Sequence, residues 1–172
     1  NMLNSTFTNN LSINATADSS YIIGNISNTV YTHTGTQSLG SGSTLINGIN
    51  SAVLFDSASN ISSAGIGVVA LLVNGQYTGV FVPPYTVEGE NNGIINLGND
   101  SAGIYGKNGT RLLNSGTINV GESSVGLYAL DSGAKTENTG VINIGKNSTG
   151  LYLKGGLDIV NNNIIAGTAS GS

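Results

Sequence analysis

The sequence predicts an all-β protein, specifically a parallel β-helix (β-solenoid) with coils of ~23 residues. Two observations support this prediction. The second half of the chain repeats one pattern in which apolar and polar residues alternate, as they do along a strand with one buried face. The whole chain has 26 Gly and only 2 Pro, and good helix formers are sparse. Short strands joined by many turns suit this composition, because Gly and Asn adopt positive φ angles at low cost.

The repeat has the pattern Asn-x-Gly-x-Ile-Asn-aliphatic-Gly-x-x-Ser-x-Gly-aliphatic-Tyr. Its units start at Asn91, Asn114, Asn138 and Asn161, and the last unit stops within the pattern at Ser172. One such unit cannot bury its own apolar face, whereas stacked units share a continuous core. Leucine-rich repeats of similar length need a Leu-x-x-Leu-x-Leu signature that is missing here. We therefore predict regular coils over residues 91–172, truncated at the C-terminal end. Residues 1–90 would form irregular coils with inserted loops, for a total of about seven or eight coils.

Stacking the units assigns a direction to each repeated side chain, because successive strand residues point to opposite faces. We expect three inward aliphatic columns: Ile95, Ile118 and Ile142; Leu97, Val120 and Ile144; and Ile104, Leu127 and Leu151. We expect two outward columns: Tyr105, Tyr128 and Tyr152; and Asn96, Asn119 and Asn143. The amides of Asn91, Asn114, Asn138 and Asn161 fall at one corner, where they can form a structural ladder.

Aromatic residues provide the candidate binding sites. Asn74-Gly75 lies between two apolar runs and predicts an inserted hairpin or loop within residues 66–85. This segment would either carry a contact surface formed by Tyr77, Phe81 and Tyr85, or be an irregular or capping coil. The column of Tyr105, Tyr128 and Tyr152 would either stack sugars or serve as a structural ladder.

Charge and composition exclude several classes of function. The net charge is −4 with no basic cluster, so nucleic acid is not an expected partner. There is no Cys, and the longest apolar run, residues 68–73, is too short to span a membrane. His33 is the only His, so we expect an isolated surface residue and neither a metal site nor a cofactor. The 9 acids share no column of the repeat, and only Glu88 and Glu90 form a close pair. We therefore expect no enzymatic activity.

The tandem units resemble those in the passenger domains of bacterial type V autotransporters, and are most similar to the large fusobacterial autotransporter adhesins. This resemblance covers residues 91–172 closely. It implies a virulence-associated adhesin that is either held on the bacterial outer membrane or secreted. Such an adhesin would be exported through a C-terminal β-barrel beyond the present sequence. Its partners would be a host-cell receptor protein or glycan, or other bacteria. Two alternatives stay open at this stage: a β-helix polysaccharide lyase or hydrolase, and a purely structural stalk.

Overall fold

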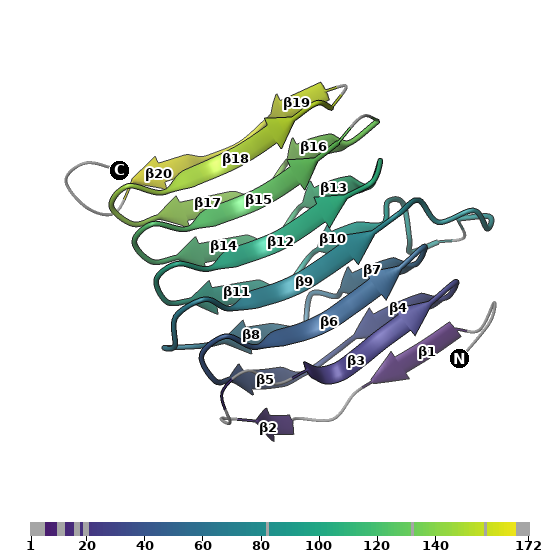
Figure 1. The fold of residues 1–172 in the computed structure, drawn as a ribbon, viewed down its shortest axis with the longest axis horizontal. Coiled ribbons are helices and arrows are strands. Elements are labelled where there is room, and N and C mark those ends of the chain that lie inside the picture. The colour runs from purple at the N-terminus through teal and green to yellow at the C-terminus, as the bar shows by residue number, and fades with distance from the viewer. Residues whose placement is uncertain are drawn as a thin grey trace.

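The protein is a parallel β-helix, as the sequence predicts. The computed structural model describes residues 6–9, 13–15, 18, 21–81, 83–131, 133–156 and 158–167, which form twenty β-strands and no helix. The strands lie in three sheets, and the chain passes through each sheet once per coil (Figure 1). Each strand pairs in parallel with the equivalent strand one coil away, so every coil protects the edge of its neighbour.

Three strands, one from each sheet, make one coil. Sheet A contains β1 (Thr6–Asn9), β4 (Val30–His33), β7 (Ala52–Phe55), β10 (Gly89–Asn91), β13 (Arg111–Asn114), β16 (Lys135–Asn138) and β19 (Asp158–Asn161). Sheet B contains β2 (Ile13–Ala15), β5 (Thr36–Leu39), β8 (Asn60–Ser62), β11 (Ile94–Leu97), β14 (Thr117–Val120), β17 (Val141–Ile144) and β20 (Ile165–Gly167). Sheet C contains β3 (Tyr21–Ser27), β6 (Thr44–Ile49), β9 (Val69–Asn74), β12 (Ala102–Lys107), β15 (Val125–Leu130) and β18 (Thr149–Lys154). The described residues thus form six complete coils and a seventh with two strands, against an expectation of seven or eight.

The aliphatic columns fill the interior as expected. Ile118 and Leu127 are fully buried, and Val120 is 5% exposed. The same columns continue into the first half of the chain, where Ile61 pairs with Ile95, and Leu71 with Ile104. Among the residues of these three columns, Leu151 alone is partly buried. It lies in β18, and the described part of the seventh coil has no sheet C strand to cover it.

The Ser and Gly of the repeat are explained by contacts between coils. The hydroxyl of Ser124 accepts a hydrogen bond from the backbone N–H of Ser101 at 3.0 Å and donates to the carbonyl of Glu122 at 2.9 Å. A Cβ atom on Gly126 would lie 2.7 Å from the carbonyl oxygen of Gly150 in the next coil. Neighbouring coils therefore approach too closely at this position for any larger residue.

Of the two forms predicted for the segment within residues 66–85, a hairpin or a loop, the hairpin is wrong. Its first apolar run is β9, a central strand of sheet C that pairs in parallel with β6 and β12. No described residue between β9 and β10 belongs to a strand. Because β9 has a parallel partner on each side, neither of its edges is free for the antiparallel partner that a hairpin needs. Residues 75–88 are instead an inserted loop, so that Val53 pairs with Gly89, 36 positions further on. The division of the chain at residue 90 stays a prediction from the repeat.

Candidate binding surfaces

The first Asn of each repeat unit forms a ladder of side-chain amides that connects four coils of the β-helix. The side-chain amide of Asn91 donates to Asn114, that of Asn114 to Asn138, and that of Asn138 to Asn161, each at 2.8 Å. The first three side chains are fully buried, and Asn161 in the seventh coil is exposed. These amides satisfy one another in the interior, so they are not available to a ligand.

The tyrosine column lies on the outer face of sheet C. The rings of Tyr105 and Tyr128 have centroids 5.0 Å apart and an interplanar angle of 34°, and those of Tyr128 and Tyr152 are 4.7 Å apart at 37°. Desolvation raises the pKa of Tyr105 above its ordinary value, and neighbouring Tyr128 and Asp131 add to the shift. Because each ring covers the face of the next, the column presents ring edges and hydroxyl groups to solvent. Its predicted role in binding sugars stays a prediction.

The loop of residues 75–88 folds back onto the outer face of sheet A. Tyr85 is 5% exposed and packs with Val30, Ala52 and Leu54, and its hydroxyl lies 2.7 Å from that of Thr32. Sheet A in coils two and three is therefore covered on both sides, which explains why all four side chains of β7 are buried.

Two aromatic rings and an ion pair hold this loop in place. Tyr77 and Phe81 meet edge to face with centroids 5.3 Å apart, and the Arg111 guanidinium lies 4.7 Å from the Phe81 ring centroid. Arg111 also forms a salt bridge of 3.0 Å with Glu88. The predicted contact residues Tyr77, Phe81 and Tyr85 thus pack within the molecule. The loop offers solvent a different side chain, Val80, which is 81% exposed.

Glu88 and Glu90 are buried by these contacts. Glu88 is 1% exposed and pairs with Arg111. Glu90 is 6% exposed and accepts hydrogen bonds from Thr86 at 2.9 Å and Asn92 at 3.0 Å. The one close pair of acids in the sequence therefore serves the packing of the loop in this structure.

The prediction that His33 lies on the surface is wrong. His33 is fully buried at the end of β4, and its ring contacts that of Phe55 edge on, with centroids 5.7 Å apart. Neither ring nitrogen has a hydrogen-bond partner. Burial lowers the pKa of His33 below its ordinary value of 6.5, and Asp56 partly opposes this shift. This burial could not be predicted, because residues 25–90 lack the clear repeat that defines the inward columns.

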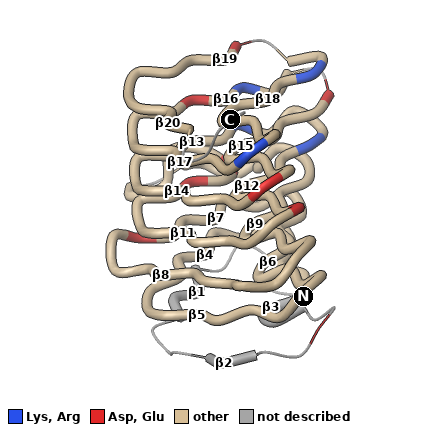
Figure 2. The backbone as a smooth tube through the Cα atoms, turned by 90° about the vertical axis from the view of Figure 1, so that its left-hand side faces the viewer, with Lys and Arg blue, Asp and Glu red and all other residues tan. Residues whose placement is uncertain are grey.

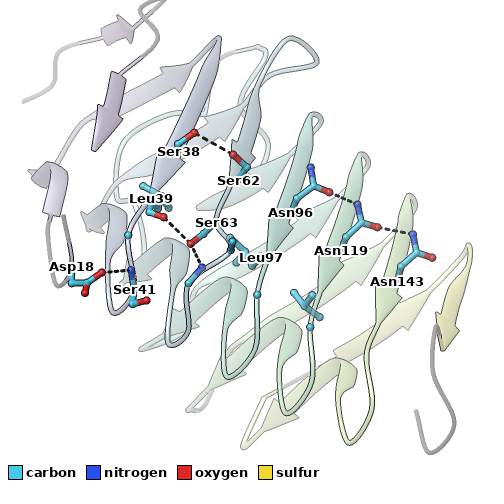
Figure 3. A pocket seen from close by; sticks show the side chains of 16 residues that line it. Asp18, Ser38, Leu39, Ser41, Ser62, Ser63, Asn96, Leu97, Asn119 and Asn143 are labelled. Carbon is cyan, nitrogen blue, oxygen red and sulfur yellow. Dashed lines mark hydrogen bonds between the residues drawn. The ribbon is translucent and has the colours of Figure 1, made fainter. Parts of the chain in front are cut away.

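A groove of about 1090 Å³ lies on the outer face of sheet B. Figure 3 shows its floor, a row of polar side chains with one from each of five successive coils: Ser38, Ser62, Asn96, Asn119 and Asn143. Asn119 donates to Asn96 at 2.5 Å, and Asn143 donates to Asn119 at 2.7 Å. The hydroxyls of Ser38 and Ser62 lie 3.4 Å apart. The turns that follow these strands form one wall of the groove, from Gly40 to Gly121.

The groove is almost without charge. Of the 16 residues that line it, one carries a charge, Asp18, whose carboxylate accepts a hydrogen bond from the Ser41 N–H at 2.9 Å. Figure 2 shows that Asp and Glu are spread over several coils, whereas Lys and Arg lie in the later coils, from β12 to β18. The described residues contain no group of three or more His, Cys, Asp or Glu that could hold a metal ion. Nor do they include a helix with the length and hydropathy to cross a membrane.

Reasoning from the sequence placed Asn96, Asn119 and Asn143 on the outside but did not identify them as a binding site. Their recurrence at one position of the repeat was the available signal. The remainder of the groove could not be found this way, because Asp18, Ser38 and Ser62 lie outside the clear repeat.

Comparison with known proteins adds one result. Searches of curated proteins and of solved structures return no significant match. The sequence model of one family, described as "BigA third pectate lyase-like domain", matches residues 1–164. The words "pectate lyase-like" describe a relationship of fold, which the three parallel sheets share, and assign no activity. The protein therefore belongs to the family of the third pectate lyase-like domain of BigA.

Proposed function

We propose that this protein is a non-enzymatic segment of a bacterial surface adhesin, whose β-helix presents binding surfaces to host-cell receptors or glycans, or to other bacteria. Membership in the BigA family supports a bacterial surface protein with a β-helix domain. The resemblance of the repeat to autotransporter passenger domains supports the finer assignment, including export to the outer surface.

This proposal rests on the chemistry of the groove on sheet B. Its lining supplies hydroxyl, amide and backbone groups that can hold a ligand, with Asp18 as the one charged side chain. Glycoside hydrolysis ordinarily needs two carboxyl groups flanking the bond that breaks. Glu88 and Glu90 do not supply them, since both are buried beneath the loop of residues 75–88. The groove is thus equipped for binding and lacks the paired carboxylates of a hydrolase.

The experiment is to measure attachment of the purified, fluorescently labelled protein to host epithelial cells and to whole bacteria. A circular dichroism spectrum typical of β-sheet establishes that the sample is folded. We expect saturable binding that excess unlabelled protein displaces. A folded protein that binds neither would contradict the proposal and favour the stalk alternative. Release of oligosaccharides that ends on changing Glu88 or Glu90 would favour the lyase or hydrolase alternative.

A further inference from the structure

We propose that the groove on sheet B binds an uncharged glycan chain, laid along the axis of the β-helix across successive coils. This inference rests on the proposed function and names its ligand class and its site. Neither the family match nor the resemblance of the repeat assigns a ligand to this face.

The first argument is the row of amides on the groove floor. Asn96, Asn119 and Asn143 occupy paired positions of β11, β14 and β17, so their side chains recur once per coil. All three are partly exposed and line the groove (Figure 3). Neighbouring strands lie ~4.8 Å apart, so the row offers the same group at a regular spacing. A polymer with a repeating unit can engage such a row at several coils at once.

The second argument is the unused hydrogen-bonding capacity of these amides. A side-chain amide has two N–H donors and two acceptor lone pairs. Asn119 uses one donor toward Asn96 and one lone pair toward Asn143, which leaves one of each. The ladder also fixes the orientation of the amide, so a ligand would not have to order it. Sugar hydroxyls both donate and accept, and they match this pattern.

The charge of the groove favours a neutral ligand. Anionic polysaccharides, including polygalacturonate, need cationic side chains or a bound metal ion to offset their carboxylates or sulfates. The described residues of the lining include no Lys, Arg or His, and the one charged residue among them, Asp18, is acidic. An anionic chain would meet repulsion without compensation, whereas a neutral chain would not.

The composition of the lining also predicts how binding should behave. No aromatic residue is among the described residues that line the groove, so sugars would be held by hydrogen bonds and not by stacking on rings. Single sugars should therefore bind weakly, and affinity should rise with chain length as more coils are engaged. Because no ion pairs are involved, affinity should change little with salt.

The test compares two matched variants on purified, folded protein. Asn119→Val removes the central amide of the groove floor. Asn47→Val is the control, because Asn47 also donates its side-chain amide to an Asn of the neighbouring coil, Asn25 at 2.7 Å, but lies on the outer face of sheet C. Val suits both positions, since β-branched residues favour strands. The probes are neutral oligosaccharides of increasing length (cello-, malto- and manno-oligomers), with polygalacturonate and heparin as anionic comparisons, in low and high salt.

We expect neutral oligomers to bind with an affinity that grows with length, at least tenfold weaker binding in Asn119→Val, and unchanged binding in Asn47→Val. Titration of ¹⁵N-labelled wild-type protein tests the site without any substitution. The side-chain amide signals of Asn96, Asn119 and Asn143 should shift, and those of Asn25 and Asn47 should not.

Three results would overturn the proposal: salt-sensitive binding of the anionic chains alone, neutral-glycan binding that is equal in both variants, or no glycan binding by folded protein. In each case attachment to cells decides the broader question. Cell binding that persists would leave the adhesin proposal intact with another site, and its absence would remove both.

Discussion

The carboxylate of Glu88 is clamped by Arg111 from the neighbouring coil. The Arg111 Nε lies 3.0 Å from Oε2 and its Nη2 3.1 Å from Oε1, and its backbone N–H donates to Oε2 at 2.8 Å. Glu88 is 1% exposed, whereas the Arg111 side chain is 39% exposed. Because Glu88 closes the loop of residues 75–88 and Arg111 opens β13, this pair fastens the loop to the stack.

Arg111→Met should therefore release the loop. The substitution leaves the buried Glu88 carboxylate without its cation, which should cost about 2–4 kcal/mol, less than for a fully buried pair because Arg111 is partly exposed. Faster proteolytic cleavage within residues 75–88 and a lower melting temperature would report this. Lys135, the strand partner of Arg111 in the next coil, is the control, and Lys135→Met should change neither. Equal effects in both variants would show that the ion pair does not hold the loop.

The direction of the side chains on β15 can be tested with two adjacent residues. Leu127→Asp places a charge at a fully buried position and should prevent the stack from folding, because an unpaired buried charge is very costly. Tyr128→Ala on the outer face should lower the free energy of unfolding by only about 1–3 kcal/mol, the value of two aromatic contacts. Thermal unfolding followed by circular dichroism measures both. An unchanged melting temperature in Leu127→Asp would refute the inward assignment.

The inner and outer amide ladders should differ in their contribution to stability. Asn114→Ala removes a buried amide that bonds to both Asn91 and Asn138, and should cost about 2–4 kcal/mol in the free energy of unfolding. Asn119→Ala on the outer face should cost less than about 1 kcal/mol, because water replaces the lost bonds. Urea unfolding of the two variants gives the comparison. Similar losses would mean that burial does not distinguish the ladders.

His33 should make the free energy of unfolding depend on pH, in a pH range just above that in which the carboxylates titrate. Its pKa in the folded state lies below the unfolded value of 6.5, so the unfolded chain binds the proton first as the pH falls. Stability should be full above 6.5 and decline as the pH falls toward the folded pKa. The loss is about 1.4 kcal/mol for each unit by which the pKa is lowered.

The variant His33→Leu isolates this effect, since His33 is the only His in the chain. Urea unfolding between about pH 8 and pH 5, above the range of most carboxylates, should show a slope for the wild type and almost none for the variant. Equal slopes in the two proteins would mean that another group carries the dependence.

Gly126→Ala tests how closely the coils approach. The added methyl carbon would lie 2.7 Å from the Gly150 carbonyl oxygen and 2.8 Å from a methyl carbon of Ile142. Since backbone cannot shift without disturbing two coils, we expect a loss of about 1–3 kcal/mol in the free energy of unfolding. Thermal unfolding measures it, and a variant as stable as the wild type would show a looser stack.

The sequence predicted the part of the fold that repeats. In the second half, Ile118 and Leu127 could be placed inside because each has an equivalent residue one coil away, and parallel stacking forces equivalent residues into register. The loop of residues 75–88 could not be placed in this way, since its position depends on contacts with Val30 of β4 and with Ala52 and Leu54 of β7. The burial of His33 and the extension of the groove to Ser38 were not predicted. Both residues lie in a coil that has the same geometry as the later coils but does not share their sequence pattern.

Glycan binding and glycan cleavage should be measured together on one sample of folded protein. The protein is incubated with neutral polysaccharides, the bound fraction is recovered, and the free fraction is examined for shortened chains or new reducing ends. We expect the wild-type protein to bind intact polysaccharide chains saturably. Asn119→Val should lose this binding, and Asn47→Val should keep it. Progressive shortening of the chains by wild-type protein would contradict this expectation and identify this β-helix as a polysaccharide-degrading enzyme.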